Sequence, residues 1–163
     1  LMTSRRIHLK IEPCKGEVLV DRDLFELLLS NLLDNAGKAS AEGKTVRMWT
    51  EPEEGIWKFH VQDQGVGMSE DDIRHVMEPF YMVDKSRSRS KNGAGLGLAL
   101  CTQILLLHGS RLEIDSTRGK APVSALSCRI EEKRNEKESK EPVLFAVCGS
   151  DYGAFHMGAG SPG

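Results

Sequence analysis

The motif that decides the fold is NLLDNAGK, at residues 31–38. It lies within a helix that the leucine-rich pattern predicts over about residues 22–41. Asn31 and Asn35 are four residues apart, so they share one face of this helix, and Lys38 stays close to that face. The two amides form either a solvated polar stripe opposite the core or a site for a hard cation. Mg²⁺ suits the second interpretation, because it takes oxygen ligands together with substrate phosphates, which Lys38 would meet.

A glycine loop, DQGVGM at residues 63–68, directly follows a strand predicted over residues 56–62. Gly65 and Gly67 lack a Cβ atom, so the backbone can approach a flat ligand closely. Asp63, at the end of the strand, is placed to accept a hydrogen bond from an exocyclic amine. The alternative is a plain turn with an N-capping aspartate.

A second glycine loop, NGAGLGLAL at residues 92–100, runs into an apolar helix, and together they occupy residues 93–109. A helix N-terminus with free backbone N–H groups is a ready anion site. The loop is neither the GxGxxG dinucleotide fingerprint nor a Walker loop, and it follows a basic loop at residues 84–92. Taken alone it is either a phosphate loop or a flexible hinge.

Composition and charge limit the classes of function. The chain has 163 residues, which favours one domain. It carries 22 Lys and Arg against 24 Asp and Glu, a net charge of −2, which gives no support to a nucleic-acid partner. No apolar run approaches the ~20 residues that a bilayer crossing needs, so we expect no membrane contact by this domain. The four cysteines are scattered and form no CxxC pair, which argues against structural zinc and for a reducing compartment.

The composition changes near residue 130. Residues 131–141 are nearly all charged and cannot bury a core, and the chain ends in a glycine-rich stretch. We therefore expect residues 1–130 to form the domain and residues 131–163 to be a disordered tail, a linker or an expression remnant. The pattern further predicts a short helix from a capping box at Ser69, and strands over residues 5–11, 17–20, 45–50, 111–116 and 123–130.

The order of these motifs resembles one family. NLLDNAGK resembles the N box of the catalytic and ATP-binding domain of sensor histidine kinases, within the GHKL superfamily. DQGVGM resembles its G1 box, EPFYMVDKSRS at residues 78–88 its F box with the lid, and GAGLGLAL its G2 box. The resemblance covers about residues 5–130. It implies an α+β fold of the Bergerat type, a two-layer α/β sandwich in which helices pack on one face of a mixed sheet.

The resemblance assigns roles to the residues of these boxes. Asn35, helped by Asn31, would bind the Mg²⁺ that bridges the phosphates of ATP, and Lys38 would contact phosphate. Asp63 would accept a hydrogen bond from the adenine amino group, and the glycines after it would frame the base. Phe80 would anchor the lid. The remaining contacts implied are those of Gly65 and Gly67 with the base, Lys85 and Arg87 with the γ-phosphate, and Gly93, Gly95, Leu96 and Gly97 with the phosphates.

The implied function is transfer of the γ-phosphoryl group of ATP to a histidine on a separate dimerisation domain of the same kinase, with a response regulator downstream. That acceptor domain is not in this chain: none of the five histidines lies in an acceptor context, and His60 and His75 are expected at the surface. We expect a cytoplasmic domain, and the sequence leaves open whether the parent kinase is membrane-anchored. One departure is Ala121-Pro122, where the family usually has Gly-Thr before its last strand.

Two other functions remain open. An anti-sigma-factor-type serine kinase shares the fold and the boxes, although the F box favours a sensor kinase. A catalytically silent nucleotide-binding module is supported by the altered loop at Ala121-Pro122 alone. Mg²⁺-dependent ATP binding that is lost in Asn35→Ala and Asp63→Ala would distinguish the kinases from the silent module.

The residue at position 31 predicts slow hydrolysis of ATP. ATP-hydrolysing members of the superfamily carry a glutamate at this position, four residues before the metal asparagine, whereas this chain has Asn31, and an amide cannot act as a general base. We therefore expect phosphoryl transfer to a protein acceptor and little phosphate release by the domain alone, as a phosphate-release assay would measure. Rapid turnover with no acceptor present would contradict this expectation.

Overall fold

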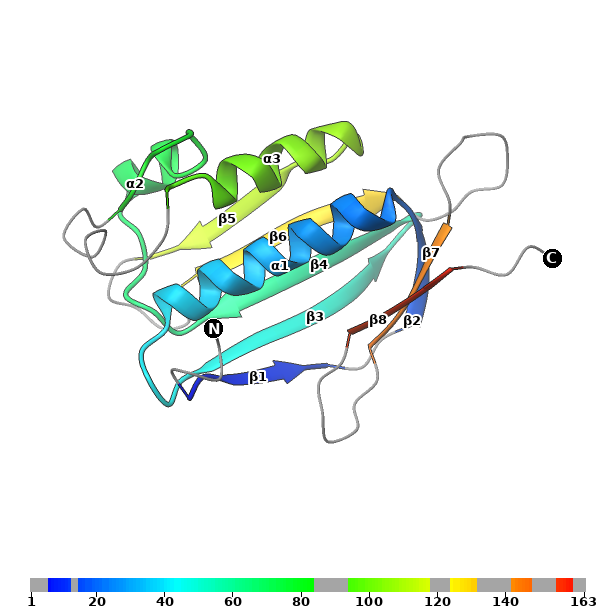
Figure 1. The fold of residues 1–163 in the computed structure, drawn as a ribbon, viewed down its shortest axis with the longest axis horizontal. Coiled ribbons are helices and arrows are strands. Elements are labelled where there is room, and N and C mark those ends of the chain that lie inside the picture. The colour runs from blue at the N-terminus through cyan, green and yellow to red at the C-terminus, as the bar shows by residue number, and fades with distance from the viewer. Residues whose placement is uncertain are drawn as a thin grey trace.

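Two long helices, α1 (Arg22–Ala39) and α3 (Gly97–Leu107), lie side by side across one face of a five-stranded sheet (Figure 1). The computed structural model describes residues 6–12, 15–83, 94–117, 124–131, 142–147 and 155–159. A short helix, α2 (Glu70–His75), lies near the start of α3. The strands of the sheet are β1 (His8–Ile11), β3 (Thr45–Glu53), β4 (Ile56–Asp63), β5 (Leu112–Ser116) and β6 (Ser124–Glu131).

The sheet has the order β1-β3-β4-β6-β5. β1 pairs parallel with β3, whereas all other neighbours are antiparallel. β4 is therefore the central strand, and its end carries the first glycine loop. This arrangement confirms the expected two-layer sandwich with a mixed sheet and helices on one face.

Helix α1 begins where the sequence predicts and ends slightly earlier. The Asp21 side chain caps the helix by accepting from the Leu24 N–H at 3.0 Å. At the other end Ser40 takes an extended conformation while its N–H still donates to Ala36 O. Gly43 lies in the turn that follows, with a φ of +76°, a conformation that suits glycine.

The core lies between the helices and the inner face of the sheet. Phe25 of α1 meets Phe59 of β4 edge to face, with ring centroids 5.1 Å apart. The strands contribute Val46, Met48 and Val61, which are also fully buried. The alternation of buried and half-buried residues along β3 and β4 is what one buried sheet face requires.

Helices α1 and α3 run antiparallel and are joined along their length. Midway, the Cys101 Sγ lies 3.8 Å from Leu28 O, and burial raises the pKa of this thiol to about 12. At the far end His108 Nδ1 lies 2.7 Å from Ile104 O, and His108 Nε2 accepts from the Asp21 N–H at 3.0 Å. Both ring nitrogens of His108 are therefore engaged, and the imidazole links the end of α3 to the start of α1.

The outer face of the sheet holds a stack of rings. Trp49 and His60 are directly opposite each other on β3 and β4, and their rings lie parallel at 4.7 Å. The Arg47 guanidinium lies 5.3 Å over the Trp49 ring. His60 is only 9% exposed, so the expectation of a surface position is wrong, because the indole covers the imidazole. Burial lowers the pKa of His60.

The structure differs from the sequence expectation beyond residue 130. Pro142–Val147 form β7 and Phe155–Ala159 form β8, and β7 pairs antiparallel with β2 (Lys15–Leu19) in a second, three-stranded sheet (Figure 1). The expectation rests on the charged residues 131–141. The apolar stretch that follows them, PVLFAV, has a composition that favours a strand. The expectation of disorder is corrected for these two strands, and the domain division at residue 130 stays a prediction.

Across the part of the chain that the structure describes, none of the helices has both the length and the apolar character needed to cross a bilayer.

The His108 contact predicts a stability difference between two variants. His108→Ala leaves the Asp21 N–H and the Ile104 carbonyl without this partner, so the free energy of unfolding should fall by about 1 kcal/mol. His108→Gln retains an acceptor at a similar reach and should recover part of the loss. Urea denaturation of both variants measures the difference, and equal losses would show that the acceptor at Asp21 contributes nothing.

Candidate functional site

The N-terminus of α3 lies directly against the two amides of α1. A Cβ atom placed on Gly97 would lie 3.1 Å from Asn35 Nδ2 and 3.3 Å from Asn31 Oδ1. The absence of a side chain at Gly97 is therefore what allows the helix to start so close to the amides. The structure brings together two of the motifs that the sequence analysis singled out.

Asn35 is the residue in this contact whose hydrogen bonding is incomplete. Its Nδ2 atom is buried and has no hydrogen-bond partner among the described residues. A buried polar group without a partner is costly unless a ligand supplies one. A phosphate oxygen can accept from this NH₂ group while Oδ1 of the same amide binds a hard cation, so Asn35 fits a metal–phosphate group.

Asn31 and Lys38 have partners within α1. The Asn31 NH₂ group donates to Leu27 O at 2.8 Å, which leaves its Oδ1 as the atom near Gly97. Lys38 Nζ lies 2.5 Å from Asp34 Oδ2, one helical turn back. The ammonium is thus held at the end of α1 that carries Asn35.

The N-terminus of α3 is electrostatically open to an anion. The N-cap residue, Leu96, makes no side-chain capping bond, and the first turn carries no acidic residue. Leu96 is 44% exposed. The first backbone N–H groups of a helix point outward and its dipole favours negative charge there, so this end suits a phosphate.

The first glycine loop begins at a buried carboxylate. Asp63, at the end of β4, is only 4% exposed, and its Oδ1 accepts from the Gly65 N–H at 2.8 Å. A Cβ atom at Gly65 would lie 2.6 Å from Ala39 O, so glycine is required for this loop to approach the end of α1. A carboxylate has lone pairs for several donors, so Asp63 can also accept from an adenine amino group.

Two contacts that the sequence analysis missed hold this loop in place. Gly67 is buried with a φ of +71°, and the N–H of the next residue, Met68, donates to Ser116 Oγ at 2.9 Å. The buried Ser40 Oγ lies 3.5 Å from the Gln64 N–H. The pattern gave no signal for these serines, because each acts at the end of an element where periodicity stops.

Phe80 and Gly95 meet through their backbones. The Phe80 N–H donates to Gly95 O at 3.0 Å, and a Cβ atom on Gly95 would lie 2.7 Å from Tyr81 O. Gly95 has a φ of +69°, a left-handed conformation that suits glycine, so the expected glycine loop extends past it and α3 begins at Gly97. The Phe80 side chain itself is 72% exposed and its φ is +67°.

The other expected site residues fall outside the described part of the chain. These are Lys85, Arg87 and Gly93, and the altered positions Ala121 and Pro122. Among the residues that the structure does describe, no three or more His, Cys, Asp and Glu side chains gather into a metal-binding group. The amide pair beside Gly97 stays the candidate cation site that the sequence predicts.

Comparison with known proteins gives one family. The sequence profile described as "Histidine kinase-, DNA gyrase B-, and HSP90-like ATPase" matches residues 20–132. The match includes both glycine loops and the helices α1, α2 and α3.

Curated relatives are sensor kinases. Sensor protein SrrB of Staphylococcus aureus (strain MRSA252) is 31% identical over 115 residues, which are 70% of this chain and 20% of the relative. Sensor histidine kinase WalK of Bacillus subtilis (strain 168) is 33% identical over 121 residues, 73% of this chain and 20% of the relative. The chain therefore spans about a fifth of the length of these relatives.

Solved structures share the fold. The mycobacterial sensor histidine kinase MprB superposes with a TM-score of 0.69 at 27% identity, covering 82% of this chain and 88% of that chain. The nucleotide-free catalytic domain of histidine kinase ThkA gives a TM-score of 0.65 at 20% identity, covering 80% and 82%, which supports the fold alone.

Gly65 offers a test of the carboxylate end of the site. Gly65→Ala places a methyl group against a backbone carbonyl and 2.9 Å from Asp63 Oδ1, and neither can move cheaply. We expect a loss of about 1–3 kcal/mol in the free energy of unfolding and weaker ATP binding, because the carboxylate must shift. Chemical denaturation and calorimetric titration with ATP measure the two effects.

Gly43→Ala is the matched control. Its φ of +76° is strained for alanine, but no atom lies within 4 Å of the added Cβ. This variant should lose about 1–2 kcal/mol of stability and bind ATP like the wild type. The site assignment would be wrong if Gly65→Ala also kept wild-type affinity.

Proposed function

Because the chain belongs to the histidine kinase-, DNA gyrase B- and HSP90-like ATPase family, we propose that it is the ATP-binding catalytic domain of a sensor histidine kinase. It transfers the γ-phosphoryl group of ATP to a histidine on a separate dimerisation domain of the same kinase, from which a response regulator then receives it. The observation that carries this proposal is the packing of Gly97 against the amides of Asn31 and Asn35.

The base of ATP lies at the end of β4. Asp63 accepts from the adenine amino group, and Gly65 and Gly67 frame the ring. The burial of Asp63 supports this assignment, because a buried carboxylate discriminates strongly in favour of a ligand that donates to it. The contact of Gly65 with Ala39 supports it too, because it holds the loop against the end of α1.

The phosphates lie between α1 and the N-terminus of α3. Asn35, with Asn31, holds Mg²⁺, and Lys38 contacts phosphate. Gly95, Leu96 and Gly97 present backbone N–H groups. Bound Mg²⁺ would neutralise charge on the phosphate oxygens. The unpartnered Nδ2 of Asn35 supports this assignment, because a phosphate oxygen is the acceptor that it lacks.

The remaining assignments are Gly93 on the phosphates, Lys85 and Arg87 on the γ-phosphate, and Phe80 as the anchor of the lid. The backbone bond from Phe80 to Gly95 supports the anchor, since it ties the F box to the phosphate loop. We also place the domain in the cytoplasm, where ATP is available.

The reaction depends on positioning and charge stabilisation. A nitrogen of the acceptor histidine forms a bond to the γ-phosphorus as the bond to the bridging oxygen breaks, and ADP leaves. Asn31 supplies no general base for water, so the acceptor histidine is the nucleophile that the site favours. The anti-sigma-factor-type serine kinase is less favoured, because the relatives are sensor kinases.

A phosphotransfer experiment tests this function. The full chain is mixed with the histidine-bearing dimerisation domain of its own kinase, Mg²⁺ and γ-labelled ATP. We expect label on the acceptor in an acid-labile, base-stable bond, as phosphohistidine gives. Asn35→Ala should lose most of the transfer, and Asp63→Asn should weaken ATP binding about tenfold or more, because a buried donor and acceptor become mismatched.

Two outcomes would overturn the proposal. Label in an alkali-labile bond would favour a serine acceptor and hence the alternative kinase. Absence of Mg²⁺-dependent ATP binding by the wild-type chain would favour the silent module. Lys58→Ala is a suitable control, because Lys58 pairs with Glu113 on the sheet, at 3.6 Å, and belongs to no part of the site.

A further inference from the structure

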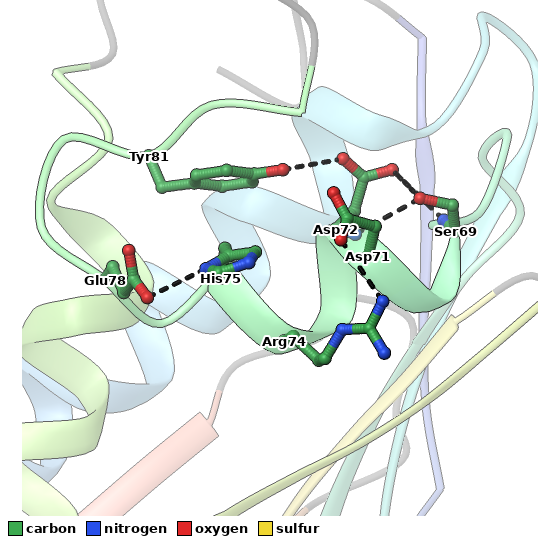
Figure 2. A network of polar contacts seen from close by, with 7 residues as sticks. All are labelled: Ser69, Asp71, Asp72, Arg74, His75, Glu78 and Tyr81. Atoms are coloured by element: carbon green, nitrogen blue, oxygen red, sulfur yellow. Dashed lines mark hydrogen bonds and ion pairs between the residues drawn. The ribbon is translucent and has the colours of Figure 1, made fainter.

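Tyr81 belongs to a polar cluster around α2 that makes none of the proposed nucleotide contacts (Figure 2). Its hydroxyl donates to Asp72 Oδ1 at 3.0 Å, and its ring lies 5.7 Å from the His75 ring. The hydrogen bond to the Asp72 carboxylate raises the pKa of the tyrosine hydroxyl, so the hydroxyl stays a donor at neutral pH. His75 in turn lies 2.9 Å from Glu78 Oε1.

Asp72 connects Tyr81 to the start of α2. Asp72 Oδ2 accepts from the Ser69 N–H at 3.1 Å and from the Ser69 hydroxyl at 2.6 Å, while the Asp72 N–H donates to Ser69 Oγ. This capping box uses one carboxylate oxygen, and Tyr81 uses the other (Figure 2). Two different segments are thereby joined to one side chain.

The backbone on the other side of Tyr81 is packed against the phosphate loop. Tyr81 O and the Phe80 carbonyl carbon would lie 2.7 and 2.8 Å from a Cβ on Gly95, so the two segments are in close contact. Phe80 has a φ of +67°, which is strained for a bulky residue and persists only where neighbouring contacts impose it. The bond from the Phe80 N–H to Gly95 O and the bond from Tyr81 to Asp72 are such contacts.

The loop that Tyr81 supports leads straight to the amides of α1. Gly95 is two residues before Gly97, which packs against Asn35 and Asn31. A displacement of the Phe80–Tyr81 backbone would therefore move the N-terminus of α3 relative to Asn35. The end of the site that receives the base of ATP is held by different contacts, namely Gly65 with Asp63 and Met68 with Ser116.

We propose that Tyr81 and Asp72 are positioning residues for the phosphate end of the nucleotide site. They hold the Phe80–Tyr81 backbone against Gly95 and thereby set the distance between the α3 N-terminus and Asn35. Neither residue touches the nucleotide. This inference rests on the proposed function, and it adds that the two ends of ATP depend on separate supports.

The experiment compares two ligands in the full chain. Tyr81→Phe removes the hydroxyl alone and leaves the ring beside His75. Affinity for ATP with Mg²⁺ should fall roughly three- to tenfold, which corresponds to the loss of one ordinary hydrogen bond. Affinity for adenosine, followed by NMR titration, should stay within about twofold, because that ligand lacks phosphates. Partial unfolding would instead weaken both ligands, so the ratio separates positioning from a general loss of structure.

Two further variants sharpen the result. Asp72→Asn offers one oxygen where the carboxylate offers two, so it should reproduce the selective loss of ATP affinity, and the double variant should lose little more than either single one. Arg74→Ala is the matched control: it removes an ion pair to Asp71 on the same helix, 3.2 Å long, without contact to Tyr81, and should bind both ligands normally.

Equal losses for ATP and adenosine in Tyr81→Phe, or no loss of ATP affinity, would overturn this inference while leaving the proposed function standing. A wild-type chain that binds adenosine but gains nothing from the phosphates and Mg²⁺ would instead overturn the proposed function and this inference with it.

Discussion

The antiparallel contact between α1 and α3 is the constraint on which the site depends. Its register is set at three points: the His108–Asp21 hydrogen bond at one end, the Cys101–Leu28 contact in the middle, and Gly97 on the amides at the other. A shift of one residue along this contact would rotate α3 by about 100° and remove Gly97 from the amides. The register of this one helix pair therefore determines both the packing of the core and the geometry of the site.

The two ends of the site, at Asp63 and at Gly97, use different kinds of chemical group. The end at Asp63 is a buried carboxylate at a strand terminus, rigid because β4 is paired on both sides. The end at Gly97 is a helix N-terminus whose field extends from backbone groups. Steric exclusion unites them: glycine at positions 65, 95 and 97 lets backbone approach backbone or amide more closely than any side chain would permit.

The sequence predicts elements with regular period and fails where contacts cross between elements. The leucine spacing predicts α1, and the alternation predicts β3 and β4, because each repeats a local geometry. The burial of His60 depends on its opposite neighbour Trp49, which no single strand reveals. Strand β7 is not predicted, because the charged residues 131–141 directly precede it. The bond from Tyr81 to Asp72 crosses an irregular turn. The resemblance to the kinase family, rather than any period, implies that Asn35 and Gly97 both lie at the phosphates of ATP.

The unpartnered NH₂ group of Asn35 is a point of local frustration in an otherwise mutually consistent set of contacts. A ligand that satisfies it binds the folded chain and not the unfolded one, and so shifts the folding equilibrium by mass action. For a domain that binds ATP, the bound nucleotide then stabilises the folded state. The concentration of ATP, in addition to the amino-acid sequence, would then contribute to the stability of the folded chain and of the contact between α1 and α3.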